Sequence, residues 1–364
     1  MIFNIISFLI AFFAIIFLVV IHEFGHFLIA KKRGVRVEEF GIGYPPRIFG
    51  KKFGETIYSI NLLPFGAFVK IYGEVGGLED YNSFSGKKIW ERMLIILGGV
   101  LAFWMVAILF LTLAFGLGMP TPVGDEDTNA INAKVQITTI ASGSPAQTAG
   151  LEPLDTILVL KSNGEELKIE KTSQVTDFIK SHKGQSVEIV LQRWGKTIDL
   201  SATPSATSLS GGGYLGIGLA RVGLVSVKWY EAPYRGIVGT GNLTIATVQA
   251  FGGVLGHIVE KKEVPAGVTL MGPLGIFNFL KQVSQLGINY FLYFLALVSI
   301  LMAISNLLPI PALDGGKLLF LIIEAVRRKP ISPKIEQNIT TTFFLLLIIF
   351  SIFVTIKFDI PRIF

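Results

Sequence analysis

The segment with the clearest potential for chemistry is the pentapeptide His22-Glu23-Phe24-Gly25-His26. Residues four positions apart lie on one face of an α-helix, so the imidazoles of His22 and His26 can bind a single zinc ion. Glu23 lies next to His22 and can act as a general base toward water held at that ion. The pattern therefore predicts a zinc site that activates water. The alternative is a chance match, in which both histidines pack against a neighbouring helix.

This pentapeptide lies at the end of an apolar run that begins at Ile2. Asn4 and Ser7 are the only polar side chains before it, and about twenty such residues cross the hydrocarbon core of a membrane. A secretory signal peptide would have a basic start and a shorter apolar core. Ionisable side chains within a membrane helix are costly and are usually functional. The setting therefore favours a functional metal site over the chance match.

The composition indicates a membrane protein that carries a soluble domain. The chain has 364 residues, of which 51% are hydrophobic, too many for an ordinary soluble protein. It contains no cysteine, so disulfides are excluded and zinc ligands must be histidines and carboxylates. The net charge of +6 comes from basic residues beside apolar runs, as the positive-inside rule requires. Nucleic-acid binding is therefore rejected.

Basic clusters predict the topology. They follow the first and third apolar runs and precede the second and fourth, which predicts four spans with both chain termini outside the cytoplasm. The resulting segments are 1–30 with the zinc motif, 31–92 on the cytoplasmic side, 93–119 as the second span, 120–220 as an inserted domain, 221–285 as an amphipathic interfacial segment, 286–326 as the third span, 327–340 as a cytoplasmic loop and 341–358 as the fourth span.

The segment 38–74 is rich in glycine, proline and aromatic residues, and its runs 56–61 and 64–69 predict short strands. We interpret it as a re-entrant β-hairpin beside the zinc, whose open edge at 58–61 adds a substrate as a further strand. A cytoplasmic loop packed on the surface is the alternative. In the second span, Gly98 and Gly99 suit either close helix approach or a tolerated kink.

The inserted domain combines strands, predicted at 134–138, 155–160 and 186–191, with a helix over Thr172–Ser181. Its segment 143–151, followed by Asp155 and Asn163-Gly164, resembles the fingerprint of bacterial PDZ domains, which hold peptide ends or extended strands. One PDZ copy on the outer face is the implied assignment. A generic small β-rich domain without a ligand is the alternative.

A third zinc ligand is expected near the end of the third span. Pro309 and Pro311 break the helix there, and Asp314 lies in otherwise apolar company. Its carboxylate would complete a site with two histidines and leave one coordination position open for water. A helix cap is the alternative role for Asp314.

Together these features resemble the site-2 protease family of intramembrane zinc metalloproteases, and within it the bacterial members with one PDZ domain. The resemblance rests on the pentapeptide, the block 40–69, the PDZ-like segment, Gly272-Pro273 and the segment 306–316. It implies that zinc is bound by His22, His26 and Asp314, that Glu23 is the general base, and that Asn306 helps to orient the substrate. Two departures stand out: Phe103 where the family often has Asn, and Gly66-Ala67 where a glycine pair is common.

The resemblance implies an α-helical membrane protein with about four transmembrane helices, a re-entrant β-hairpin and an inserted extracytoplasmic α+β PDZ-like domain. It implies a bacterial cytoplasmic (inner) membrane as the location. Its expected substrates are single-span membrane proteins trimmed by an earlier protease, such as anti-sigma factors or remnant signal peptides, with peptide ends held at the PDZ-like domain. The alternative is an inactive, membrane-anchored PDZ protein that only binds peptides. Glu23 argues against it, because a structural zinc site needs no base.

Overall fold

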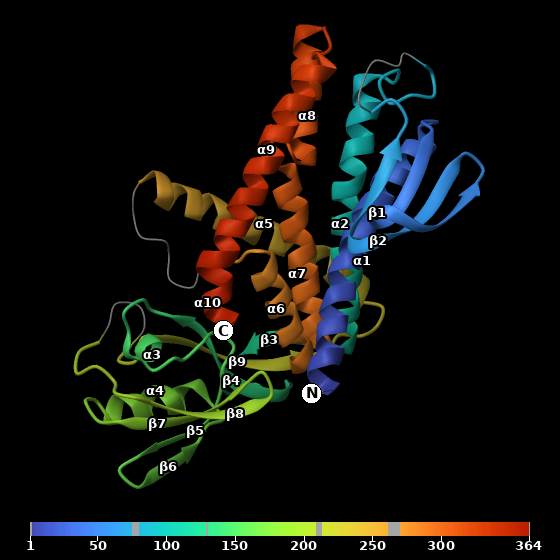
Figure 1. The fold of residues 1–364 in the computed structure, drawn as a ribbon. Coiled ribbons are helices and arrows are strands. Elements are labelled where there is room, and N and C mark those ends of the chain that lie inside the picture. Colours follow the sequence, from blue (N-terminus) through green and yellow to red (C-terminus); the bar gives the residue numbers. More distant parts are fainter. Residues whose placement is uncertain (1, 75–79, 129, 209–212, 261–269, 364) are drawn as a thin grey trace.

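The computed structural model describes residues 2–74, 80–128, 130–208, 213–260 and 270–363 (Figure 1). Within these residues, four helices are long and apolar enough to cross a membrane, in agreement with the number predicted from the sequence. They are Ile5–Lys32, Ile89–Leu117, Ile288–Leu307 and Pro333–Ile363.

Three of these helices form the apolar core. Helix α2 (Ile89–Leu117) packs against α1 (Ile2–Lys32) and against α7 (Ile288–Leu307), and side chains from all three helices form one buried cluster. The remaining helices are α5 (Ala232–Val259), which lies against α2, α6 (Pro273–Val283), which contacts α1 and α7, α8 (Asp314–Arg327), α9 (Pro333–Val354) and the short α10 (Ile360–Ile363).

The long helices place the chain termini at one end of the bundle. In Figure 1 the N-terminus, the C-terminus and the domain with most of the strands lie toward one end of the long helices, while α8 and the start of α2 lie toward the other. This arrangement is the one that an even number of crossings produces.

Two long, bent strands follow α1. Strand β1 (Val37–Phe53) pairs with β2 (Thr56–Ile71), and both strands bend. As a result, the first part of β1 pairs with both ends of β2, and the first part of β2 pairs with both ends of β1. Tyr58, for example, lies between Phe40 on one side and Lys51 on the other. The predicted open edge at 58–61 is therefore wrong, because Tyr58 to Ile60 have partners on both sides. Among the described residues, the segment 67–71 pairs with 37–42 on one side only, and we call its other side, from which the Val69 N–H donates to Glu23 of α1, the free edge.

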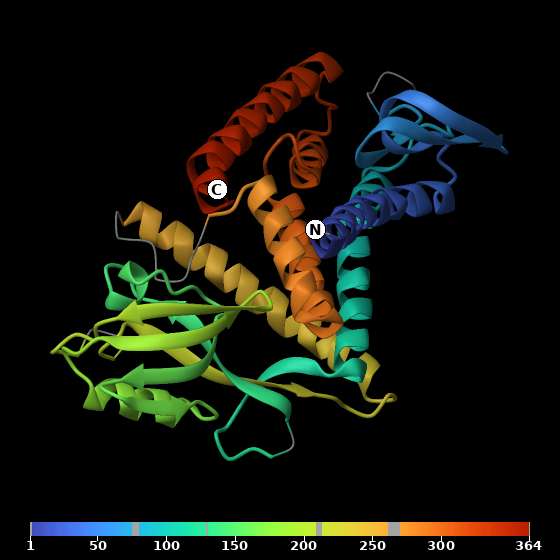
Figure 2. The ribbon, with the colours of Figure 1, turned by 60° about the horizontal axis from the view of Figure 1, so that its bottom comes forward.

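Residues 119–225 form a domain that we name the β domain. Its sheet has the order β3-β9-β4-β5-β7-β8, with β6 paired to β5, and α4 (Thr172–Ser181) covers part of one face (Figure 2). All three predicted strands and the predicted helix are present. The strands are β3 (Met119–Val123), β4 (Ile131–Ile140), β5 (Thr156–Ser162), β6 (Glu165–Lys168), β7 (Val187–Arg193), β8 (Lys196–Ala202) and β9 (Ile217–Val225), and α3 (Pro145–Thr148) is a single turn.

Candidate active site

The first pair of candidate ligands is positioned where α1 crosses α2. Gly25 of α1 lies against Gly98 of α2, where an added Cβ would fall 2.7 Å from the Gly98 carbonyl carbon and 2.8 Å from Ala102 Cβ. No larger residue fits there without moving a helix. Close helix approach, and not a tolerated kink, therefore explains Gly98. The crossing brings the His22 and His26 face of α1 against α2.

The third candidate ligand is positioned by a tight turn between α7 and α8. Helix α7 ends at Leu307 and α8 begins with Asp314. The next two residues, Gly315 and Gly316, are buried. They leave no room for a side chain, because a Cβ on Gly315 would overlap the Leu307 carbonyl and one on Gly316 would overlap Ile310. The glycines let the chain fold back closely after Pro309 and Pro311, so Asp314 points toward α1.

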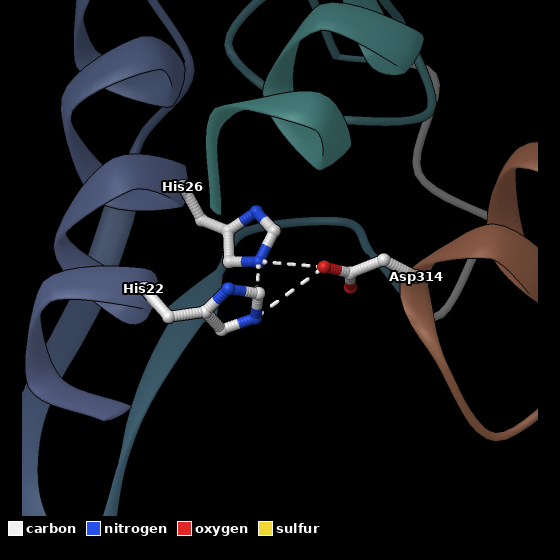
Figure 3. A group of neighbouring side chains, drawn as sticks. All are labelled: His22, His26 and Asp314. Atoms are coloured by element: carbon white, nitrogen blue, oxygen red, sulfur yellow. Dashed lines mark hydrogen bonds and ion pairs between the residues drawn. The ribbon is translucent and has the colours of Figure 1, made fainter. Parts of the chain in front are cut away.

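The three side chains converge (Figure 3). His22 Nε2 and His26 Nε2 lie 3.2 Å apart, and Asp314 Oδ2 lies 3.3 Å and 3.4 Å from them. Bonds of about 2.0–2.1 Å to a tetrahedral zinc place neighbouring ligand atoms roughly 3.3–3.4 Å apart. The observed triangle therefore fits this ion. Among the described residues, these three side chains are the one group of at least three His, Asp or Glu whose ligand atoms converge in this way.

The hydrogen bonds around the triangle also suit a cation. His26 Nδ1 lies 2.9 Å from the Ile95 carbonyl oxygen, which makes Nδ1 the donor and leaves the Nε2 lone pair facing His22 and Asp314. Asp314 Oδ2 is buried and accepts no hydrogen bond from the described residues. A buried carboxylate oxygen without a donor is expensive unless a cation satisfies it.

Glu23 faces the cavity beside the triangle. Its Oε2 accepts a hydrogen bond of 3.1 Å from the Val69 backbone N–H, which ties the carboxylate to the free edge of β2. The cavity has a volume of about 250 Å³, and its walls include Glu23, the three candidate ligands and Tyr44. Such a space admits water and part of a peptide backbone.

An ion pair forms part of the cavity wall. Lys317, one turn after Asp314 on α8, donates to the Glu74 carboxylate, just beyond the end of β2, and both residues line the cavity. The pair connects α8, which carries Asp314, to the end of β2, the strand whose Val69 N–H donates to Glu23.

Two residues of α2 bound the histidine rings. Phe103 is fully buried and stacks on His22, with ring centroids 4.7 Å apart and planes at 20°. Gly99 lies against both rings, and a Cβ there would overlap His26. Phe103 therefore holds the His22 ring in place by packing.

The structure brings four of the five predicted site residues together. The fifth, Asn306, donates from Nδ2 to the Met302 carbonyl oxygen of its own helix over 2.9 Å and does not line the cavity; its role in orienting substrate stays a prediction. Val69, Tyr44 and the Lys317–Glu74 pair were not predicted. Only Lys317, one helical turn after Asp314, carried a signal that sequence reasoning could have used.

Comparison with known proteins gives a consistent result. Residues 10–350 match the profile of peptidase family M50. A predicted zinc metalloprotease of Clostridium perfringens is 33% identical over 345 residues, which cover 93% of this chain and 94% of that protein. The zinc metalloproteases RasP of Geobacillus kaustophilus and Shouchella clausii are each 28% identical, over 97% and 98% of this chain and 96% and 99% of theirs. The similarity spans α1, α8 and the β domain.

Proposed function

This chain belongs to peptidase family M50 and is a zinc-dependent membrane metalloprotease of the site-2 type, and we propose that it cleaves single-span membrane proteins already trimmed by another protease. The observation that carries the proposal is the triangle of ligand atoms, 3.2–3.4 Å apart, beside the Glu23 carboxylate. A carboxylate held next to a metal site with three protein ligands is the arrangement for hydrolysis.

In this proposal His22, His26 and Asp314 hold the zinc ion. When bound, zinc supplies a Lewis acid that polarises the scissile carbonyl and makes water more acidic. Glu23 takes the proton from the attacking water and later delivers it to the leaving amine. The Val69 N–H keeps the carboxylate aimed into the cavity through its 3.1 Å hydrogen bond.

The substrate must be unwound before it is cut, because a helix hides its carbonyl groups in its own hydrogen bonds. We place the unwound segment along the free edge 67–71, in place of the 58–61 edge inferred from the sequence. This edge borders the cavity, since the Val69 N–H points away from β1 and toward Glu23. Strand addition there would present an extended backbone to the zinc site.

We propose that the β1–β2 hairpin enters the membrane. The turn between β1 and β2 is at Gly54-Glu55, but both strands also bend, and Phe65 lies in the bend of β2. Phe65 is 72% exposed and lies 6.4 Å, between ring centroids, from Phe12 of α1. Phe12 precedes Glu23 by about 16 Å of helix, so the bend reaches well into the span. Large apolar side chains in and beside the bends of the two strands suit a lipid environment: Ile48, Phe49, Leu62, Leu63 and Phe65.

We propose that the β domain is a PDZ-like filter on the outer side of a bacterial cytoplasmic membrane. A groove of about 510 Å³ runs between α4 and β9, with walls that include Val175, Ile179 and Ile217. Apolar walls of this kind suit a peptide end. The basic clusters at 31–33 and 327–329 lie at the C-terminal ends of α1 and α8, away from the β domain. Basic clusters favour the cytoplasmic side, which supports an outer position for the β domain.

The test compares purified wild type with Glu23→Gln in detergent, on trimmed and untrimmed forms of one single-span substrate, with zinc assayed in each protein. We expect equal zinc, cleavage by wild type alone, and preference for the trimmed form. Glu55→Gln, which removes an exposed carboxylate paired with Lys31 outside the cavity, is the matched control and should cleave normally. Zinc without cleavage in any protein would favour the inactive peptide-binding alternative.

A further inference from the structure

Tyr44 is a cavity residue that the proposed chemistry leaves unused. It belongs to β1, yet its side chain reaches the cavity that holds Glu23 and the three candidate zinc ligands. Several other rings of the hairpin, such as Phe40 and Phe65, contact rings of α1. Tyr58, for example, contacts Phe27, Phe40 and Phe53 and does not line the cavity.

Two residues of β2, Phe68 and Gly66, contact the Tyr44 ring. The ring stacks on Phe68, with centroids 6.4 Å apart and planes at 15°. The ring also lies against Gly66, where an added Cβ would be 2.9 Å from Tyr44 Cε2 and 3.3 Å from the hydroxyl oxygen. Gly66 also has φ +141°, which other residues rarely adopt. The hydroxyl is therefore fixed above the beginning of the free edge 67–71.

The hydroxyl is available as a donor. Within the described part of the chain, it makes no hydrogen bond. A tyrosine hydroxyl is protonated at neutral pH and can donate to a carbonyl oxygen.

A substrate strand needs a donor at this place. Pairing along 67–71 ends near Gly66, where β2 bends, and Pro64 has no N–H to offer. The substrate carbonyl just beyond the paired segment has also lost its helical hydrogen bond. An unpaired carbonyl is costly in a cavity at membrane depth.

We propose that the Tyr44 hydroxyl donates a hydrogen bond to a backbone carbonyl of the substrate, at the point where the substrate leaves the free edge 67–71. This inference rests on the proposed function and on strand addition at this edge. Tyr44 is thus a substrate-binding residue that contacts the substrate backbone and not a side chain. Its contribution to substrate binding is therefore the same for substrates of different sequence.

Steady-state kinetics of Tyr44→Phe test the proposal, on trimmed single-span substrates of two different sequences. The variant keeps the ring and removes only the hydroxyl. We expect kcat/KM to fall about tenfold for both substrates, mainly through KM, since a hydrogen bond of this kind acts in the bound substrate and the transition state alike. Zinc content and melting temperature should match wild type. Tyr58→Phe, in the same hairpin, should stay within twofold.

Each other outcome overturns the inference. Wild-type kinetics in Tyr44→Phe would show that the hydroxyl contacts no substrate. Loss of zinc or of thermal stability would assign Tyr44 to the folded structure alone. An effect on only one substrate would indicate side-chain recognition. Absence of Glu23-dependent cleavage by wild type would refute the proposed function itself, which separates that failure from a failure at Tyr44.

Discussion

Gly99 offers a direct test of how the histidine rings are held. A Cβ at this position would lie 2.6 Å from His26 Cε1 and 2.7 Å from His22 Cε1. Carbon atoms in contact are ordinarily at least about 3.4 Å apart, so Gly99→Ala requires the rings or α2 to move by roughly 0.7 Å. Phe103, one turn further along α2, stacks on the His22 ring and limits its movement.

The expected effect follows from the tolerance of zinc sites. Ligand distances there vary by only about 0.2 Å, and displaced supporting contacts cost about 10-fold to 100-fold in metal affinity. We therefore expect Gly99→Ala to bind zinc at least tenfold more weakly and to lose cleavage in proportion. The assay is zinc content after equilibration with a competing chelator, together with cleavage of a trimmed substrate.

Gly116→Ala is the matched control on the same helix. Its added Cβ would lie 3.9 Å from Ala232 Cβ, an ordinary contact, so zinc binding and cleavage should equal wild type. If Gly99→Ala also behaved like wild type, the histidine rings would not lie against α2 as described, and the derivation of the site from the α1–α2 crossing would fail.

Two further predictions concern the stability of the helices around the site and of the β domain. Ser299 is fully buried and donates to the Phe103 carbonyl oxygen over 2.8 Å, so Ser299→Ala should lower stability in a detergent unfolding titration by about 1 kcal/mol, whereas exposed Thr342→Ala should not. Asp125 accepts hydrogen bonds from the Thr172 and Ser173 amides at the start of α4. Asp125→Ala should therefore lower the free energy of opening of α4 by about 1 kcal/mol, measured as faster amide exchange in this helix. Asp177→Ala should leave the exchange rates unchanged. Burial alone would raise the pKa of Asp125, but the amides and hydroxyls of Thr172 and Ser173 together hold it below its usual value; the cap therefore acts above about pH 4 and is lost as the pH falls below it.

The sequence was informative where chemistry depends on local spacing. His22 and His26 are four residues apart on one helix, and this spacing predicts that they bind one metal ion. Asp314 could be predicted because few carboxylates lie in apolar surroundings, although 288 residues separate it from His26. The strand and helix positions in the β domain follow from local alternation in the same way.

The sequence was uninformative where the answer depends on which segments become neighbours. The β-branched and aromatic residues of 56–61 and 64–69 indicate strands, but they do not determine which segment lies at the edge of the sheet, so the predicted 58–61 edge is wrong. Gly98 and Gly99 are adjacent and identical in type, yet one allows α1 to approach and the other leaves room for two rings. Tyr44 carries no local signal, because its place in the cavity depends on Phe68 and Gly66.

The wide separation of the candidate ligands along the chain has a consequence for biosynthesis. Ribosomes make His22 and His26 first and Asp314 only near the end of the 364-residue chain. Until α8 has been made and Asp314 has come beside His22 and His26, the nascent protein has two imidazoles without the third candidate ligand, and metal binding of this kind is coupled to folding. If these three residues bind the zinc, we expect that the protease cannot cut neighbouring membrane proteins while it is still being inserted. Activity would begin only when Asp314 reaches the two histidines.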